Sequence, residues 1–319
     1  MIEFFKEPNI DWMGKAKYFF ALSAILLLIG WFSIFSKGGL YYSIDFKGGT
    51  NVDVQFSLPP DVDQIRKALG AHGLGNSEIQ SINDIGAKSN EVLIFVGQNG
   101  TSDEAADNSK NDVINALKSA GVGTFAIRGA EIVGAKVGGE LRQQAIWVTL
   151  LALGGMLLYI AFRFEWVFGA AAVLAVFHDV LITLGFFSLL HFEISLTVIA
   201  ALLTLVGYSM NDTIVIFDRI RENRRLLRKE EFAALVNKSI NQTLSRTILT
   251  SGLTFLTVLV LFLMGGQVLR AFSFALVVGI VVGTYSSFGI AAPLVVFWHR
   301  FRDKTEAAGS GSQPARKPA

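Results

Sequence analysis

Residues 166–217 read WVFGAAAVLAVFHDVLITLGFFSLLHFEISLTVIAALLTLVGYSMNDTIVIF. Two apolar runs, 166–190 and 194–217, fill almost all of this stretch, and a link of only three residues separates them. A helix needs about 20 apolar residues to cross the hydrocarbon core of a bilayer, and each run is long enough. The stretch therefore predicts two successive membrane-spanning helices.

The composition of the whole chain agrees with a membrane protein. Of the 319 residues, 52% are hydrophobic and 17% are charged, and the mean hydropathy is +0.48. Soluble domains carry about 25% charged residues. The balance argues against a soluble enzyme, a disordered chain and a collagen-like fibre. Cysteine is absent, which excludes disulfides, thiolate metal sites and a cysteine nucleophile, and a net charge of +2 is too small to suggest nucleic acid as a partner.

Four further runs complete a set of six predicted spans, at 18–35, 145–162, 247–264 and 271–298. Lys15 and Lys17 precede the first run, as they would in a secretory signal. The run lacks an A-x-A-type cleavage site and is longer than a usual signal core, so we expect an uncleaved anchor.

The positions of Lys and Arg predict the orientation of these spans. Segment 218–246 carries eight of them, whereas the short links 191–193 and 265–270 hold only Arg270. Positive residues favour the cytoplasmic side, so we expect both termini, 1–17 and 299–319, to be cytoplasmic, with a disordered end from 306. The basic segment 218–246 is either this sorting signal alone or a docking site for a ribosome, lipid headgroups or a partner subunit.

The segment between the first two spans, 36–144, is then extracytoplasmic and has the size of one small domain. Its periodicity predicts six elements in the order strand–helix–strand–strand–helix–strand, which is the ferredoxin-like α+β pattern. The expected strands are 51–56, 77–83, 91–97 and 124–133, with a turn between the second and the third. The first expected helix is 61–72. The second begins at a capping box formed by Thr101 and Glu104 and runs to about residue 120. No nucleophile–base pair or metal-binding cluster is evident, and His72 is expected at the surface. This domain is predicted to make contacts rather than to perform chemistry.

The start of this domain, Asp45-Phe46-Lys47-Gly48-Gly49-Thr50, contains two adjacent glycines. Glycine permits positive φ angles and the close approach of another backbone. The alternative interpretation is a bulge between two strands.

Ionisable residues interrupt the apolar runs, although a charge in the centre of a span costs at least about 2.5–3.5 kcal/mol. His178 and Asp179 lie near the middle of one run, Asn211 and Asp212 lie in the next, and Arg246 opens the fifth. Asp212 is expected about 10 Å inward from Arg219.

Two interpretations of Asp212 stay open. In the first, Asp212 carries protons. Burial favours its neutral form and a nearby Arg246 favours its charged form, so a small movement would change its protonation. Alternatively it bonds to neighbouring helices together with Asn211, Ser209 and Thr213. The pair His178 and Asp179 has the same two interpretations.

The sixth run carries small residues spaced by four, which form one face for close helix packing, within the chain or against another subunit: Ala275, Gly279, Gly283, Ser287 and Ala291.

Several of these motifs resemble one family. The segment Ile44–Thr50 (IDFKGGT) resembles the Phe-x-Gly-Gly motif of the SecD/SecF membrane subunits of the bacterial Sec protein-export machinery. The run Gly207–Asn223 (GYSMNDTIVIFDRIREN) is similar to the SecF version in particular, and His178-Asp179-Val180 and Ser245-Arg246-Thr247 match it too. The resemblance covers nearly the whole chain, from about residue 10 to 302.

The resemblance implies a fold, a location and partners. It implies a multi-pass protein of the bacterial cytoplasmic (inner) membrane, in the resistance–nodulation–division superfamily, which uses the proton gradient. It implies SecD as the partner that completes a twelve-span unit, then the SecYEG channel, YajC as a further candidate and unfolded preprotein as the substrate. The implied function is promotion of late, proton-motive-force-driven steps of preprotein export, with no cofactor beyond the proton.

The resemblance also implies roles for particular residues. Asp212 would carry the proton, Arg246 would be its basic partner, and Asn211, His178 and Asp179 would support them. Six spans without internal duplication suggest half of a transporter, so Asp212 is expected to face the partner's half.

Other functions stay open at this point. A solute or lipid exporter of the same superfamily usually has larger external domains, and a purely structural subunit would move no protons. Sodium is an alternative coupling ion. An enzyme is not expected, since no G-x-S-x-G, H-E-x-x-H or phosphate-loop motif occurs.

Overall fold

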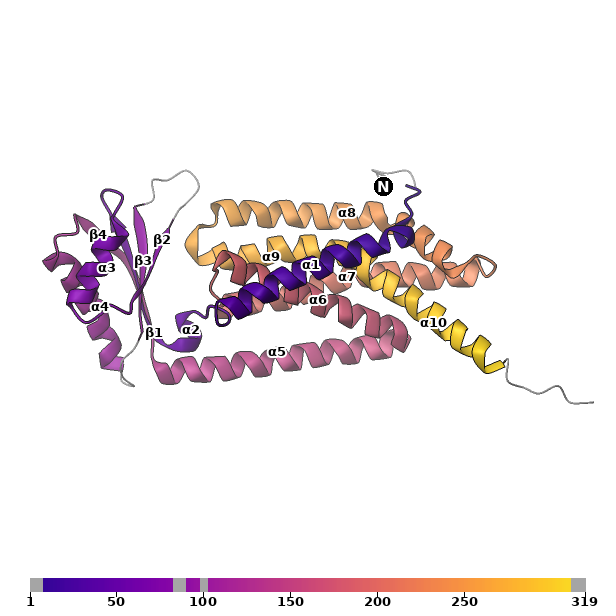
Figure 1. Cartoon of the computed structure of the whole chain (residues 1–319), viewed down its shortest axis with the longest axis horizontal. Coiled ribbons are helices and arrows are strands. Elements are labelled where there is room, and N and C mark those ends of the chain that lie inside the picture. The colour runs from indigo at the N-terminus through magenta and orange to yellow at the C-terminus, as the bar shows by residue number, and fades with distance from the viewer. Residues whose placement is uncertain (1–7, 83–89, 98–102, 311–319) are drawn as a thin grey trace, which may run out of the picture.

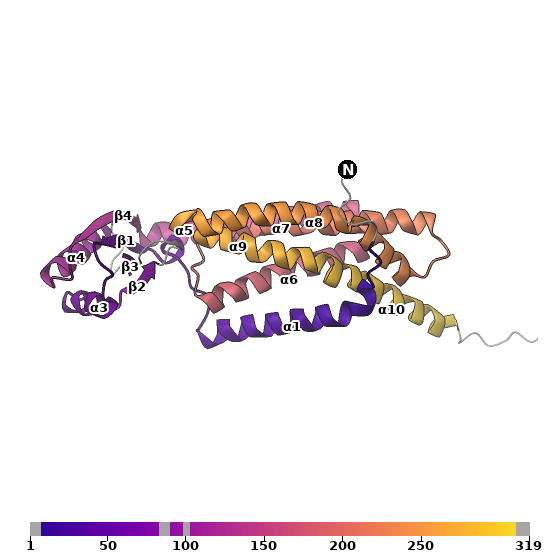
Figure 2. The ribbon, with the colours of Figure 1, turned by 90° about the horizontal axis from the view of Figure 1, so that it is seen from above.

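A computed structural model describes residues 8–82, 90–97 and 103–310. Six helices in this part of the chain are long and apolar enough to cross a membrane, which confirms the predicted multi-span helical class. A sheet domain stands at one end of the helical bundle, and α1 begins and α10 ends at the other (Figures 1 and 2). The bundle consists of α1 (Trp12–Ser36), α5 (Ala135–Arg163), α6 (Trp166–Leu190), α7 (Leu196–Leu226), α8 (Phe232–Met264), α9 (Gly266–Ser286) and α10 (Ala292–Ser310).

Several helices extend beyond the apolar runs. Helix α1 begins before residue 18 because the Asp11 carboxylate caps it, accepting from the Gly14 amide at 2.9 Å. Helix α5 begins at Ala135 rather than at residue 145. The basic segment 218–246 is mostly helix and not loop, since only 227–231 separate α7 from α8. Ion pairs such as Arg219–Glu222 (2.6 Å, i,i+3) support helix in this charged stretch.

The sixth span is not one regular helix. A π-helical turn, η1 (Ser287–Ala291), joins α9 to α10. Pro293 lies two residues after the end of this turn. A proline has no amide hydrogen and clashes with the carbonyl four residues earlier, which explains the irregular turn. Helix α10 then runs to Ser310, so the expectation of disorder from 306 is wrong for 306–310, and 311–319 lie outside the described residues.

The external domain has the predicted order of elements. The strands β1 (Gly49–Phe56), β2 (Glu78–Ile82), β3 (Glu91–Val96) and β4 (Phe125–Val133) form an antiparallel sheet in the order β2-β3-β1-β4. This is the split βαβ arrangement, with α3 (Val62–Ala71) and α4 (Asp103–Ser119) packed on its core. The predicted turn at 83–89 and Thr101 of the capping box lie outside the described residues.

The glycine motif is a helical turn, not a bulge between strands. Ser43 caps the short helix α2 (Ile44–Lys47), and Gly48 and Gly49 follow with φ angles of 72° and 140°. A Cβ atom on Gly49 would lie 2.7 Å from the Val96 carbonyl oxygen. Positive φ and close backbone approach therefore both require glycine at Gly49.

Small residues set the distances between helices in the bundle. A Cβ on Gly30 of α1 would lie 2.7 Å from the Gly185 Cα of α6. A Cβ on Gly279 would meet the Leu205 side chain at 2.5 Å, and one on Gly283 would meet Ser209 at 2.9 Å. The small face of α9 thus packs against α7 of the same chain.

Candidate functional site

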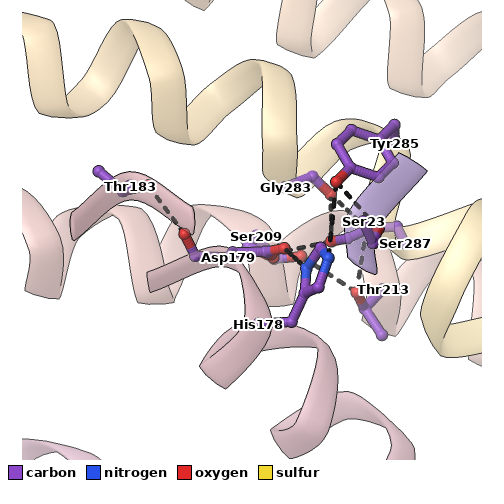
Figure 3. A network of polar contacts seen from close by, with 10 residues as sticks. Ser23, His178, Asp179, Thr183, Ser209, Thr213, Gly283, Tyr285 and Ser287 are labelled. Carbon is purple, nitrogen blue, oxygen red and sulfur yellow. Dashed lines mark hydrogen bonds and ion pairs between the residues drawn. The ribbon is translucent and has the colours of Figure 1, made fainter. Parts of the chain in front are cut away.

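Asp179 is the centre of a buried polar network (Figure 3). Its side chain comes from α6 and is 1% exposed. One carboxylate oxygen lies 2.8 Å from His178 Nδ1. The other accepts from Ser209 of α7 at 2.6 Å and from Ser286 of α9 at 2.8 Å. A single carboxylate therefore binds three helices together.

The network continues from His178 toward α1. Nε2 of His178 lies 3.5 Å from the Tyr285 hydroxyl, which is 3.1 Å from Ser23 Oγ (Figure 3). The sequence pairs His178 with Asp179, and the structure brings them together. Tyr285 and Ser23 were not predicted, because hydroxyls in apolar runs reveal nothing of their partners.

A second hydroxyl pair lies where the π-helical turn meets α7. Thr213 Oγ1 lies 3.0 Å from Ser287 Oγ, which donates to the Gly283 carbonyl at 2.9 Å. Ser287 therefore fastens the irregular turn to α7 by a hydrogen bond in addition to close packing.

Asp212 has a different environment from Asp179. It is 3% exposed and accepts from Ser251 Oγ of α8 at 2.8 Å. The structure gives it this one side-chain donor among the described residues, whereas Asp179 has three partners. Fewer hydrogen-bond donors therefore stabilise the charged form of Asp212 than that of Asp179.

Arg246 and Asp212 do not form an ion pair in the part of the chain that the structure describes. The Arg246 side chain is exposed, yet close enough to act electrostatically on the Asp212 carboxylate. Arg246 also lines a cavity of about 350 Å³ between α7 and α8. The other residues that line it are Val215, Asp218, Arg219, Glu222, Gln242 and Thr243.

The side chains of Asn211 and Asp212 lie in different environments. Its side chain is exposed, on the same face of α7 as Thr204 and Gly207. Asp212 instead points toward α8 of its own chain, which corrects the expectation that it faces a partner. Ser251 was not predicted as its donor.

A second cavity, of about 420 Å³, lies between the sheet domain and the link from α6 to α7. Tyr41, Glu78 and Glu193 line it, and the Tyr41 ring stacks on His191. Burial raises the pKa of Glu193 to about 7, and the Glu78 carboxylate adds to this rise, while Lys47 opposes it. The described residues contain no cluster of three or more His, Cys, Asp or Glu side chains placed to hold a metal ion.

Comparisons with known proteins match both the glycine motif and the membrane-spanning part of the chain. Residues 112–301 match the family described as "Protein export membrane protein SecD/SecF, C-terminal", and residues 32–57 match the "SecD/SecF GG Motif". The "Protein translocase subunit SecF" of Koribacter versatilis is 42% identical, with 99% of this chain and 98% of the relative covered. The subunit of the same name from Calditerrivibrio nitroreducens is 46% identical, and the alignment covers 91% of this chain and 94% of the relative.

The fold also matches a solved structure. The crystal structure of SecDF from Thermus thermophilus, described as a translocon-associated membrane protein, aligns with a TM-score of 0.81 at 43% identity. The alignment covers 92% of this chain and 39% of the SecDF chain. In that protein a SecF-like part and a further part are therefore joined in one polypeptide.

Replacement of the two buried carboxylates should affect stability very differently. Asp179→Ala removes the carboxylate that His178, Ser209 and Ser286 share, although Ser286 can still donate to the Gly283 carbonyl. We expect a loss of about 3–5 kcal/mol in the free energy of unfolding. Asp212→Asn keeps an acceptor for Ser251 and should cost less than about 1 kcal/mol. Unfolding in detergent, followed by circular dichroism, measures both. Equal losses would contradict the distinction between the two sites.

The pKa of Glu193 predicts a pH dependence of the contact between sheet domain and bundle. Its pKa in the folded protein lies above the ordinary value of 4.5, so its stabilisation is complete below pH 4.5 and is lost as the pH rises through about 7. Full ionisation would cost the folded state about 3 kcal/mol. We expect thermal stability to be higher at pH 5 than at pH 8, and Glu193→Gln to reduce the difference. The exposed residue Asp112 provides the control: Asp112→Asn should leave the pH dependence unchanged, and an unchanged dependence in Glu193→Gln would refute the assignment.

Proposed function

This chain belongs to the SecD/SecF family of protein-export membrane proteins, and from that premise we propose that it is the SecF-type subunit of a protein translocase that uses the proton gradient to promote late steps of preprotein export. The relatives are named as translocase subunits, which is a transport function and not an enzymatic one. One observation supports the proton-coupling part of the proposal: the Asp212 carboxylate is buried and, among the described residues, accepts a side-chain hydrogen bond from Ser251 alone.

The proposed cycle uses the position of Asp212 between α7 and α8. In the charged state, Arg246 and the Ser251 hydroxyl stabilise the carboxylate. Protonation removes the charge, and with it the attraction that favours a close approach of α7 and α8 near Arg246. The open cavity beside Arg246 offers water access from the basic end of the bundle. Each proton that crosses a potential of 100 mV supplies about 2.3 kcal/mol for such a movement.

Family membership and the exposed surfaces of the bundle support a proposal for partners and orientation. The SecDF relative supports SecD as the partner that completes a twelve-span unit, since that polypeptide is much longer than this chain. The exposed face of α7 at Thr204, Gly207 and Asn211 suits close packing of such a partner. We further propose a location in the bacterial cytoplasmic membrane with both termini cytoplasmic, together with SecYEG, YajC and preprotein as partners.

A purely structural role is the second candidate, because the Ser251–Asp212 hydrogen bond also joins two helices. The two functions differ in whether Asp212 titrates. Sodium coupling and proton coupling differ in whether a pH gradient without a sodium gradient is enough to accelerate preprotein release.

The test uses inverted vesicles that contain SecYEG, SecD and this chain. A preprotein is stalled after ATP-driven insertion, and its release is followed with and without a proton gradient. We expect the gradient to accelerate release at least about tenfold with the wild type and Asp212→Asn to lose that gain, because Asn keeps the hydrogen bond but cannot exchange a proton.

Glu140→Gln provides the matched control, since this carboxylate is exposed on α5. It should keep the full gain. If Asp212→Asn also keeps it at equal assembly, Asp212 has only a structural role. If a sodium gradient alone replaces the proton gradient, proton coupling is wrong.

A further inference from the structure

The glycine motif lies at the junction of the sheet domain with two helices. It begins at the end of the connection from α1 and leads directly into β1. Its short helix α2 is closed by Ser43 at one end, where the Asp45 amide donates to Ser43 Oγ at 3.2 Å, and by Gly48 at the other. These caps fix the backbone of the short helix that carries Asp45.

Asp45 points to the start of α7. Its carboxylate oxygen Oδ2 accepts a hydrogen bond of 2.9 Å from the Leu196 amide, the first residue of that helix. The amides of the first helical turn have no partner within the helix, and the helix dipole favours a negative charge there. Asp45 therefore supplies, from the external domain, a second side-chain cap for α7 in addition to Ser195, which accepts from Val198.

Backbone bonds reinforce this contact. The Ser43 amide donates to the Ile194 carbonyl at 3.0 Å, and the Ile194 amide donates to the Tyr41 carbonyl at 2.7 Å. Chain segment 41–45 and the link before α7 therefore run side by side through three hydrogen bonds. An axial displacement of α7 must either move the motif with it or break these bonds.

Packing joins the same motif to α5 and to the bundle core. Phe46 is 8% exposed and belongs to the apolar cluster that includes Val198 and Leu202 of α7. A Cβ on Gly138 of α5 would lie 3.0 Å from the Gly48 amide nitrogen. The motif is thus held between α5, α7 and β1 and has little freedom to move independently of them.

Helix α7 also carries Asp212, sixteen residues after Leu196. A continuous helix of this length spans about 24 Å, so it transmits an axial movement from one end to the other. We propose that Asp45 is the positioning residue that couples α7 to the external domain, so that a change at Asp212 is delivered to the sheet through the Asp45–Leu196 hydrogen bond. This coupling rests on the proposed proton-driven function.

The test compares variants in the complete chain, assembled with SecD and SecYEG. Asp45→Ala removes the cap, and Asp45→Asn keeps an acceptor oxygen but not the charge. Asp61→Ala is the matched control, since Asp61 caps α3 within the same domain by accepting from the Asp63 amide at 2.9 Å. Hydrogen exchange of the peptide that covers 195–198 measures the cap, and gradient-driven preprotein release measures the coupling.

We expect Asp45→Ala to speed exchange at Leu196 roughly tenfold and to lose most of the gradient-dependent gain, while ATP-driven insertion and assembly stay intact. Asp45→Asn should keep most of the gain, and Asp61→Ala should change neither readout.

The outcomes separate this proposal from the one it rests on. If Asp45→Ala keeps the full gain while Asp212→Asn loses it, the coupling role of Asp45 is wrong and the proton-driven function stands. Unchanged exchange at Leu196 in Asp45→Ala would refute the cap itself. If Asp212→Asn keeps the gain, the proton-driven function fails first, and the coupling fails with it.

Discussion

A carboxylate inside a membrane-spanning bundle must find its hydrogen-bond donors within the protein, because the hydrocarbon offers none. Asp179 meets this constraint by collecting a histidine and two serines from its own and two neighbouring helices. The arrangement of α6, α7 and α9 follows from it, since Ser209 and Ser286 reach the carboxylate only where small residues let the helices approach. Gly283, which packs directly on Ser209, is one of these.

The second carboxylate, Asp212, lies in the same bundle but has fewer hydrogen-bond partners among the described residues. In the part of the chain that the structure describes, Asp212 has one side-chain donor, Ser251, and Arg246 acts on it electrostatically without forming an ion pair. Protonation of a carboxylate with one donor gives up less hydrogen-bond energy than protonation of a carboxylate with three donors. Helix α7 thus contributes to both sites. Ser209 belongs to the network around Asp179, and Asp212, three residues later, is the carboxylate that we propose changes its protonation state.

Properties that depend on one segment at a time could be predicted from the sequence. The apolar runs predicted six spans, and the periodicity of 36–144 predicted the order of the sheet domain. Helix ends were predicted less well, because the basic residues of 218–246 continue α7 and α8 through side-chain pairing. Properties that depend on two distant segments could not be predicted. Ser251 is the partner of Asp212 across two helices, and Leu196 follows Asp45 by 151 positions. The π-helical turn could have been predicted from Pro293, but an analysis of hydrophobic periodicity alone does not consider the effect of proline on the backbone.

Infrared difference spectroscopy on the reconstituted complex with SecD tests the central claim, that Asp212 changes its protonation state, most directly. Acidification of the medium should produce a protonated-carboxyl band in the wild-type spectrum. We predict that this band is missing from the spectrum of Asp212→Asn. The same band at full intensity in Asp212→Asn would contradict the claim and assign the proton to another carboxylate.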